Sequence, residues 1–440
     1  MTSSADVQAA TEVVVLKNPM RGDPPNDQHL PASGSIPELF HRQLPGYRPT
    51  PLIDLPRLAE RFGVGRVLLK DESNRFGLPA FKMLGASWAS YCALEVLLAE
   101  RTGDPPAAFG SLVDLATRLE PLRPLALATA TDGNHGRAVA RFARLVGLDA
   151  RIFVPAGTSV ARIDAIRGEG ASCSVVDGTY DDAVARAASE AADDCLVISD
   201  TSWPGYDTVP RRVIEGYQTI FWELLHQGLD AMLPQPTVVI VPIGVGALAA
   251  AAATYFRSHS WPVGQSSRPP ILIGVEPDTA NCLMASVEAG HLVEVPGPHR
   301  SVMAGLNCGM GSPVAWPWVS TGFDWFVAGG DDLATTGMQL LADHGIVSGE
   351  SGACTVGALA ALSAGAGRSH GLELSFDDVV LVLSTEGATD PAYYERIVGR
   401  SPELVAEQAP RCACDPGPNS DSRCPMDGCP TPCRPTVAAS

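Results

Sequence analysis

The sequence predicts an α/β protein built on parallel, doubly wound sheets. Short apolar runs bounded by turn residues alternate with stretches of helical length along most of the chain. Several apolar runs end directly in glycine-rich or polar turns, which is typical of parallel strands joined by helices. With 440 residues and 45% hydrophobic content, the chain is long enough for about two domains.

The alternation can be followed in order along the chain. β-Branched and leucine-rich runs predict the strands Val67–Lys70, Leu125–Ala130, Ala150–Val154, Cys173–Val176, Leu196–Ser199, Thr237–Pro242, Ile271–Val275 and Val379–Leu383. Longer stretches between them predict the helices Leu55–Phe62, Met83–Leu98, Gly136–Leu145, Val160–Arg167, Asp181–Ala192, Arg212–Leu225, Leu248–Phe256, Leu333–His344 and Thr355–Ala364.

The two ends of the chain differ from this body. The first 36 residues contain prolines and no cationic start before an apolar core, so we expect a flexible arm, not a signal peptide. Residues 406–440 are rich in Pro, Cys, Asp and Ser and are expected to be a disordered tail. The cysteine spacings of this tail match no standard zinc site, so no metal is expected.

Charge and apolar content exclude some partners. A net charge of −18 opposes binding to nucleic acid or to anionic membranes. No apolar run is long enough to cross a bilayer. We therefore expect a cytoplasmic protein with reduced thiols. A bridge between Cys282 and Cys308 is conceivable, but free thiols are favoured.

One lysine stands where a predicted loop becomes a helix. Gly77 and Pro79 interrupt regular structure, and the helix begins directly after Lys82. The flanking Phe81 and Met83 would partly desolvate the Lys82 amine, and desolvation together with the positive end of a helix lowers a lysine pKa. A neutral amine can form a Schiff base with an aldehyde cofactor. The alternative is a lysine that extends past apolar neighbours toward solvent.

A glycine-rich turn lies between a predicted strand and a predicted helix. The strand that ends at Pro242 runs into Gly244, Val245, Gly246 and Ala247. Glycine lets the backbone approach an anion closely, and a helix N-terminus offers free N–H groups. The third glycine and the downstream acid of a dinucleotide fingerprint are missing, so a single phosphate fits better. A turn that needs glycine only for steric reasons is the alternative.

Two polar turns also follow predicted strands. The turn after Ala130 contains Asp132 and Asn134, whose amide can donate to a phenolate or a carboxylate. Ser384 ends the last predicted strand, where its hydroxyl could bond to a ring nitrogen. The alternatives are an Asx-Gly turn that caps the helix from Gly136 and a helix N-cap at Ser384.

The order of these motifs resembles that of the fold-type II, or tryptophan-synthase-β-like, pyridoxal-phosphate enzymes, from about residue 39 to residue 400. Among them the chain is most similar to the diaminopropionate ammonia-lyases. Asp132 precedes Gly-Asn-His-Gly, whereas serine and threonine dehydratases usually have serine there. The other similar segments are residues 75–85, 200–206, 303–309 and 384–391.

The resemblance implies two domains with pyridoxal 5′-phosphate in the cleft between them. The large domain would comprise residues 37–88 and 207–405, and the small domain residues 89–206. Lys82 would bond to the cofactor aldehyde, Asn134 to its phenolic oxygen and Gly244–Ala247 to its phosphate. Ser384 would face the pyridine nitrogen and leave it unprotonated, which favours β-elimination over transamination.

The implied substrate is 2,3-diaminopropionate, which would yield pyruvate and ammonia. Because the family accepts both enantiomers, a base is needed on each face of the cofactor. Lys82 would serve one face and Asp132 the other, while Asp200 would contact the substrate ammonium. A homodimer is also implied. Two alternatives stay open: a related eliminase, dehydratase or synthase acting on serine, threonine or another β-substituted amino acid, and an inactive cofactor-binding regulatory protein.

Overall fold

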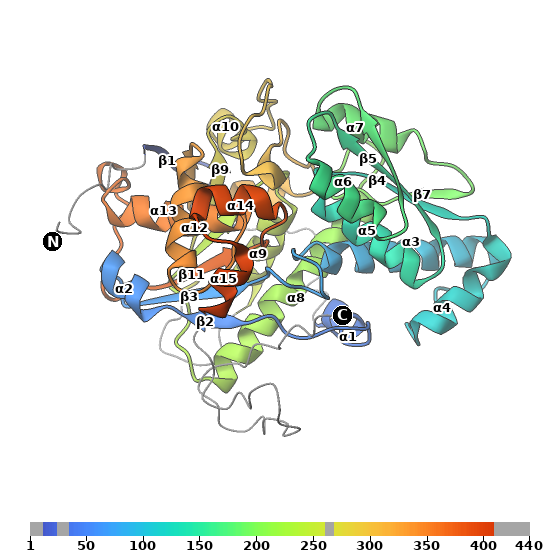
Figure 1. Cartoon of the computed structure of the whole chain (residues 1–440), viewed down its shortest axis with the longest axis horizontal. Coiled ribbons are helices and arrows are strands. Elements are labelled where there is room, and N and C mark those ends of the chain that lie inside the picture. Colours follow the sequence, from blue (N-terminus) through green and yellow to red (C-terminus); the bar gives the residue numbers. More distant parts are fainter. Residues whose placement is uncertain (1–11, 24–34, 260–267, 409–440) are drawn as a thin grey trace.

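The computed structural model describes residues 12–23, 35–259 and 268–408. Its strands form two sheets (Figure 1). The larger sheet has the order β1 (Val13–Lys17), β10 (Trp325–Gly329), β9 (Ile271–Pro277), β8 (Val238–Pro242), β11 (Val379–Ser384), β3 (Arg66–Asp71) and β2 (Leu52–Asp54). The smaller sheet has the order β6 (Ser172–Val176), β5 (Asp149–Pro155), β4 (Ala126–Ala130) and β7 (Cys195–Val197).

The strands at the centre of both sheets run parallel. In the larger sheet, β10, β9, β8, β11 and β3 are parallel neighbours, and β1 and β2 add antiparallel at the two edges. Every pair in the smaller sheet is parallel. The predicted α/β class is therefore confirmed, although the larger sheet is mixed at its edges.

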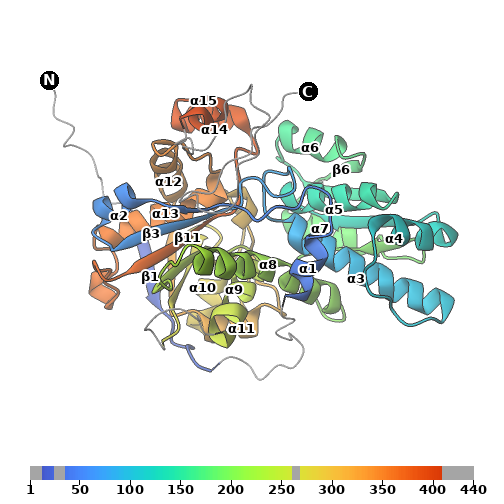
Figure 2. The same cartoon turned by 90° about the horizontal axis from the view of Figure 1, so that it is seen from below.

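Figure 2 shows the larger sheet between two layers of helices. One layer consists of α8 (Thr208–Asp230), α9 (Ala247–Ser258), α10 (Cys282–Ala289) and α11 (Trp316–Gly322). The other consists of α2 (Pro56–Phe62), α12 (Asp332–Ala342), α13 (Glu350–Ser363), α14 (Pro391–Val398) and α15 (Pro402–Glu407). Along β8, Val239 and Val241 pack against the first layer, and Val238 and Ile240 pack against the second. A strand buried on both faces reads as a continuous apolar run, which explains why β8 was predictable.

The smaller sheet packs against α5 (Asn134–Leu145) and α6 (Val160–Arg167) on one face and α7 (Tyr180–Ala188) on the other. The helix α3 (Met83–Thr102) leads from the lysine segment to this part and packs against α8. The two helices approach closely at Gly216, which has no side chain. A Cβ atom there would lie only 2.5 Å from the carbonyl oxygen of Leu84. We propose the domain division given above, with the smaller sheet in the small domain.

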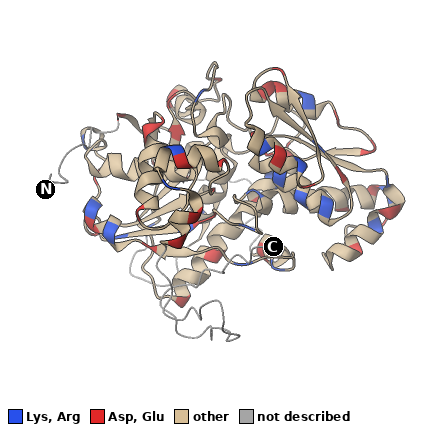
Figure 3. Ribbon diagram, viewed as in Figure 1, with Lys and Arg blue, Asp and Glu red and all other residues tan. Residues whose placement is uncertain are grey.

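Five shorter helical segments complete the described residues. These are the helices α1 (Ile36–His41) and α4 (Leu112–Leu119) and three single-turn 3₁₀ segments at residues 120–122, 304–306 and 368–370. In the view of Figure 3, acidic and basic residues are interspersed over the helices of both sheets. Among the described residues, no helix has the length and hydropathy needed to span a membrane.

The N-terminal segment differs from the sequence-based expectation. Within the expected flexible arm, Val13–Lys17 forms β1, which pairs with β10 over its whole length. The Asn18 amide donates to the carbonyl oxygens of Ser320 and Phe323 at 2.8 and 2.6 Å. The expectation was wrong here because these partners lie about 300 residues further along the chain. The expected tail lies outside the described residues from residue 409 on.

Candidate active site

A cavity of about 700 Å³ lies between the two sheets. Its walls come from both, at the edge where the parallel strands end, which is where α/β proteins bind ligands. The predicted site residues that line it are Lys82, Asp132, Asn134, Asp200, Gly244, Val245, Gly246 and Ala247. The structure thus brings together residues from segments that are widely separated in the sequence.

The segment before Lys82 is hydrogen-bonded to the end of the last strand. The backbone N–H of Phe81 donates to the carbonyl of Thr385 at 3.3 Å, and that of Gly387 donates to the carbonyl of Pro79 at 2.9 Å. Lys82 is the residue before the first residue of α3, as the sequence predicts. These bonds place the Lys82 side chain at the cavity wall.

The Lys82 ammonium forms an ion pair with Asp200. Its Nζ atom lies 2.8 Å from Asp200 Oδ2, and the carboxylate is almost fully buried. Burial by itself lowers the pKa of Lys82, but the charge of Asp200, with smaller effects of Tyr217 and Asp132, outweighs burial and raises it. The expectation of a lowered pKa is therefore wrong for the protein without cofactor, because the sequence does not show this partner.

Asp200 is held in its charged form. Burial raises its pKa, but the nearby Lys82 ammonium more than offsets this effect and leaves the pKa below its usual range. The Tyr180 hydroxyl donates to Asp200 Oδ1 at 3.3 Å. Burial and the neighbouring carboxylate raise the pKa of Tyr180, so the phenol keeps its proton. Asp200 therefore orients two proton-bearing groups in the cavity.

Asp132 differs from Asp200 because its carboxylate forms no hydrogen bond with any described residue. It lines the cavity and is half-buried. Burial raises its pKa, against the opposite effects of Arg162 and Lys82, and the charges of Glu386 and Asp200 act with burial. A carboxylate with a raised pKa is a stronger base than an ordinary aspartate. Asp132 thus has the properties of a general base.

The Asn134 side chain is not used as a helix cap. Gly133, with φ of 148°, is the N-cap of α5 and has no side-chain cap bond, so the capping alternative is wrong. Asn134 Nδ2 instead donates to Glu386 Oε2 at 2.6 Å across the cavity wall. Because the amide faces the cavity, it is available to a ligand that displaces Glu386.

The glycine turn before α9 has no room for side chains. Gly246 has φ of +98°, and a Cβ atom there would lie 2.7 Å from a methyl carbon of Leu283. A Cβ atom on Gly244 would lie 2.9 Å from the carbonyl oxygen of Gly305. The steric reason for glycine therefore holds, and the same geometry leaves the N-terminus of α9 open to an anion in the cavity.

Ser384 is the one predicted site residue that does not line the cavity. It is fully buried, and its hydroxyl donates to Ser348 Oγ at 2.8 Å. It is not a helix N-cap either, because α14 begins at Pro391 and its cap is Asp390. The cavity wall next to Ser384 is formed by Thr385 and Glu386.

The sequence did not point to several titratable residues that line the cavity, among them Arg162, Tyr180, Glu350 and Glu386. Arg162 donates from Nη2 to Thr389 Oγ1 at 3.2 Å, which joins α6 to the segment after β11. Glu386 lies in the segment that ends the last strand, which is the only signal that could have identified it. Arg162 lies on a predicted helix, where a charged residue is usually solvent-exposed. Tyr180 and Glu350 lie just before predicted helices and are the first residues of α7 and α13.

The electrostatic environment of Glu350 predicts a pH-dependent stability. Burial and the charge of Glu386 raise its pKa from 4.5 to about 7. The folded protein then holds this proton where the unfolded chain has lost it, so stability falls as pH rises from 4.5 to 7. Glu350→Gln removes this effect and should raise the free energy of unfolding by about 3 kcal/mol above neutral pH.

Urea unfolding at pH 4 and pH 8 measures this effect. The stability gain of Glu350→Gln over the parent should be present at pH 8 and small at pH 4. Glu373→Gln is a suitable control, because the Glu373 side chain is 71% exposed. An equal gain at both pH values would contradict the prediction.

Comparisons with known proteins agree with this geometry. Residues 43–385 match the family described as pyridoxal-phosphate dependent enzyme. Diaminopropionate ammonia-lyase from Escherichia coli K12 is 39% identical over 382 residues, which cover 83% of this chain and 91% of that protein. The enzyme of the same name from Salmonella typhimurium LT2 is 38% identical over 82% of this chain and 91% of its own length.

Solved structures give the same result. The crystal structure of the Escherichia coli diaminopropionate ammonia-lyase with an aminoacrylate-PLP azomethine reaction intermediate has a TM-score of 0.77 and 34% identity. The match covers 88% of this chain and 97% of that one. Threonine deaminase isoform 2 from Solanum lycopersicum shares the fold, with a TM-score of 0.66 and 21% identity over 90% of this chain and 98% of that one.

A cavity between two α/β units, lined by a lysine and a glycine turn, defines a fold-type II pyridoxal-phosphate enzyme, and the family match establishes this class. The sequence identity to the diaminopropionate ammonia-lyases, and the share of the chain that it covers, narrow the class further. The chain belongs to the diaminopropionate ammonia-lyase family.

Proposed function

We propose that this protein eliminates ammonia from 2,3-diaminopropionate, with pyridoxal 5′-phosphate as cofactor, to give pyruvate and a second ammonia. The observation that carries this proposal is the arrangement of Lys82, Asp200 and Asp132 around one cavity. A lysine paired with one carboxylate and a second carboxylate with no hydrogen bond provide two candidate bases and negative charge for a diamino substrate. The family to which the chain belongs supports the same reaction.

The cavity fits pyridoxal phosphate. The amine of Lys82 lies at one part of the wall, and the N-terminus of the twelve-residue helix α9 lies at another, behind Gly244 and Gly246. A Cβ atom at either glycine would collide with its neighbours, so the backbone there can approach an anion. When bound, the cofactor supplies an electron-accepting ring that stabilises the charge left on the substrate after proton loss.

The residues of the chain then divide the proton transfers. Lys82, in its unprotonated form and oriented by Asp200, takes the α-proton on one face of the bound substrate. Asp132, whose raised pKa makes it a better base, takes it on the other. Asp200 also attracts the distal ammonium of the substrate, and the protonated Tyr180 beside it lies within the same cavity wall.

The remaining site assignments are also proposals. Asn134 is proposed to donate to the phenolic oxygen of the cofactor, either with its second amide hydrogen or in exchange for its bond to Glu386. Gly244, Val245, Gly246 and Ala247 are proposed to hold the phosphate. Ser384 is proposed to face the pyridine nitrogen, and for this its hydroxyl must leave Ser348.

An assay with four substrates tests the proposed function. The protein with cofactor should release pyruvate and ammonia from L- or D-diaminopropionate, or from both, faster than it releases pyruvate from serine or 2-oxobutanoate from threonine. The dehydratase alternative has support of its own, because a threonine dehydratase from Escherichia coli is 29% identical over 63% of this chain and 44% of its own length. Faster turnover of serine or threonine would favour that alternative, and no turnover of any of them would favour an inactive regulatory protein.

The family resemblance also leads us to propose a homodimer in the cytoplasm. Light scattering of the purified protein gives its molar mass, and fractionation of cells gives its location. A monomeric mass of 46.1 kDa would contradict the dimer.

A further inference from the structure

A buried cluster of charged side chains lies directly before the lysine segment. Lys70 is near the end of β3, Glu72 and Arg75 follow it, and Glu223 comes from the middle of α8. These side chains are between 0 and 1% exposed, and none of them lines the cavity. The cluster is therefore separate from the groups that contact a ligand.

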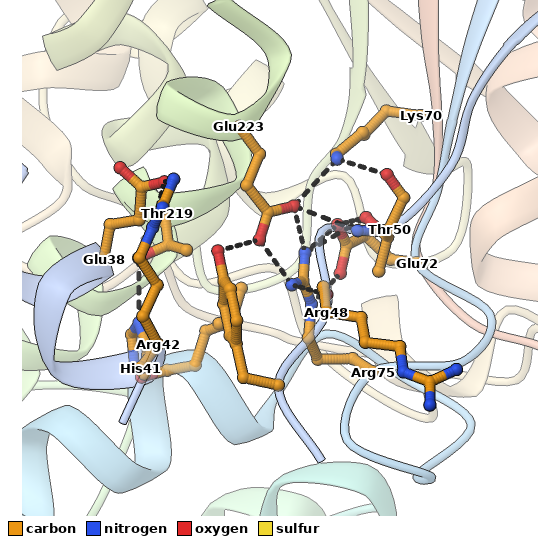
Figure 4. Close-up of polar contacts among 12 residues, drawn as sticks. Glu38, His41, Arg42, Arg48, Thr50, Lys70, Glu72, Arg75, Thr219 and Glu223 are labelled. Atoms are coloured by element: carbon orange, nitrogen blue, oxygen red, sulfur yellow. Dashed lines mark hydrogen bonds and ion pairs between the residues drawn. The ribbon is translucent and has the colours of Figure 1, made fainter. Parts of the chain in front are cut away.

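Arg75 is at the centre of this cluster (Figure 4). Its Nε and Nη2 atoms donate to Glu72 at 2.9 and 2.7 Å, and its Nη1 and Nη2 atoms donate to Glu223 at 2.6 and 2.8 Å. Lys70 Nζ donates to Glu223 Oε2 and to the carbonyl of Thr50, both at 2.8 Å. One guanidinium thus binds two carboxylates with its planar set of donors.

Stability alone does not explain why these charges are buried. Well-packed apolar side chains of similar volume usually stabilise a fold as much as a buried ion pair does. A network of directional bonds, in contrast, fixes the relative positions of its members. Here it fixes the end of β3, the loop at Arg75, the middle of α8 and the segment around Thr50.

The loop that Arg75 begins has an unfavourable backbone conformation. Arg75 and Leu78 exchange backbone hydrogen bonds of 2.8 and 2.9 Å around a turn in which Phe76 has φ of 57° and Gly77 has φ of 74°. Positive φ at both central positions defines a type I′ turn, and a bulky residue rarely adopts it. Such a conformation persists only where the surroundings impose it, so the Arg75 contacts have a geometric task.

This turn leads to Lys82 within four residues. The backbone N–H of Glu72 donates to the carbonyl of Ser384 at 2.8 Å. The segment is therefore hydrogen-bonded to the end of β11 both before and after the turn. At the other end of the segment, Lys82 Nζ lies 5.9 Å from the centre of the Tyr217 ring. Tyr217 comes from α8, which also provides Glu223. The same helix therefore supports the segment at both ends.

We propose that Arg75 is a positioning residue for the reaction. Its guanidinium, bound by Glu72 and Glu223, holds the segment from residue 72 to residue 82 so that the Lys82 amine meets Asp200 and the cofactor. The inference rests on the proposed bond between Lys82 and the cofactor, and it does not depend on which amino acid is the substrate.

The test uses two variants loaded with pyridoxal phosphate. Arg75→Met combined with Glu72→Gln removes one cation and one anion, so the pair Lys70–Glu223 keeps the remaining charges balanced. Because a displacement of about 1 Å at a reacting group costs on the order of 10²-fold, kcat should fall by about that factor while KM changes little. The visible band of the lysine-bound cofactor should weaken. Arg75→Lys keeps the positive charge but not the planar set of donors, so its kcat and its cofactor band should fall less.

Arg257→Lys is the matched control. Arg257 is 3% exposed at its side chain and forms a 2.6 Å ion pair with Asp324, also with a planar set of donors, at the far end of α9. This variant should lower the melting temperature but leave kcat and the cofactor band unchanged. The proposal is overturned if the Arg75 variants that fold also keep kcat and the cofactor band unchanged. The cofactor band reports on Arg75 even if diaminopropionate is not the substrate, so the two proposals can fail separately.

Discussion

Replacement of Lys82 by alanine is expected to abolish the visible band of the lysine-bound cofactor and to lower turnover by about 10⁴-fold or more. The chain contains only three lysines, Lys17, Lys70 and Lys82. Lys70 is buried in an ion pair with Glu223, and Lys17 is exposed on the edge strand β1. Neither lines the cavity, so no other lysine can form the bond to the cofactor aldehyde.

Absorption spectroscopy and mass spectrometry after borohydride reduction measure this loss. Lys82→Ala should retain the fold and should bind the cofactor without a covalent bond, through the turn Gly244–Ala247. Lys17→Ala serves as the control and should behave like the parent. A reduced adduct on Lys70 or Lys17 in the Lys82→Ala variant would overturn the assignment.

Replacement of Asp132 by asparagine is expected to affect one enantiomer of the substrate far more than the other. Asparagine keeps the size of the side chain but cannot accept the α-proton, and a positioned base contributes about 10²- to 10⁴-fold. The enantiomer served by Asp132 should slow by that factor, and the resemblance indicates the D form. The other enantiomer is served by Lys82 and should lose less, through weaker attraction of the substrate ammonium.

Separate rate measurements on the two enantiomers make each the control for the other. Small, equal losses for both would show that Asp132 acts only in the turn. Asp132→Ser provides a second test, because dehydratases usually have serine at this position. A gain of activity on serine or threonine in that variant would identify Asp132 as a residue that selects the substrate.

Burial of every residue made β8 predictable but not β10, which is buried to the same extent. The run Thr237–Pro242 predicted β8 because every residue of that strand is buried. In contrast, β10 and α11 escaped prediction. Trp325–Gly329 is a short run that follows a helix containing Pro317, so neither element shows a clear period. The edge strand β2, with three residues, is too short to form a pattern.

The same limit applies to the cavity. Turns at strand ends were recognisable, because glycine and asparagine have specific backbone uses there. The direction of the Lys82 pKa was not, because it depends on Asp200, which is 118 residues away in sequence. Arg162 and Tyr180 have no local signal either. Their role follows from where α6 and α7 end up in three dimensions, and a local pattern contains no information on that.

The edge position of β1 has a consequence for biosynthesis. The smaller sheet consists of a continuous stretch from residue 126 to residue 197, so it can form while the ribosome is still adding the second half of the chain. Strand β1 is synthesised before the strands of this sheet but must wait, since the bonds that Asn18 makes next to it span 302 and 305 residues. Contacts of such long range form slowly. The nascent chain thus carries an unpaired N-terminal strand until β10 has left the ribosome, and it needs protection from other strand edges during that time.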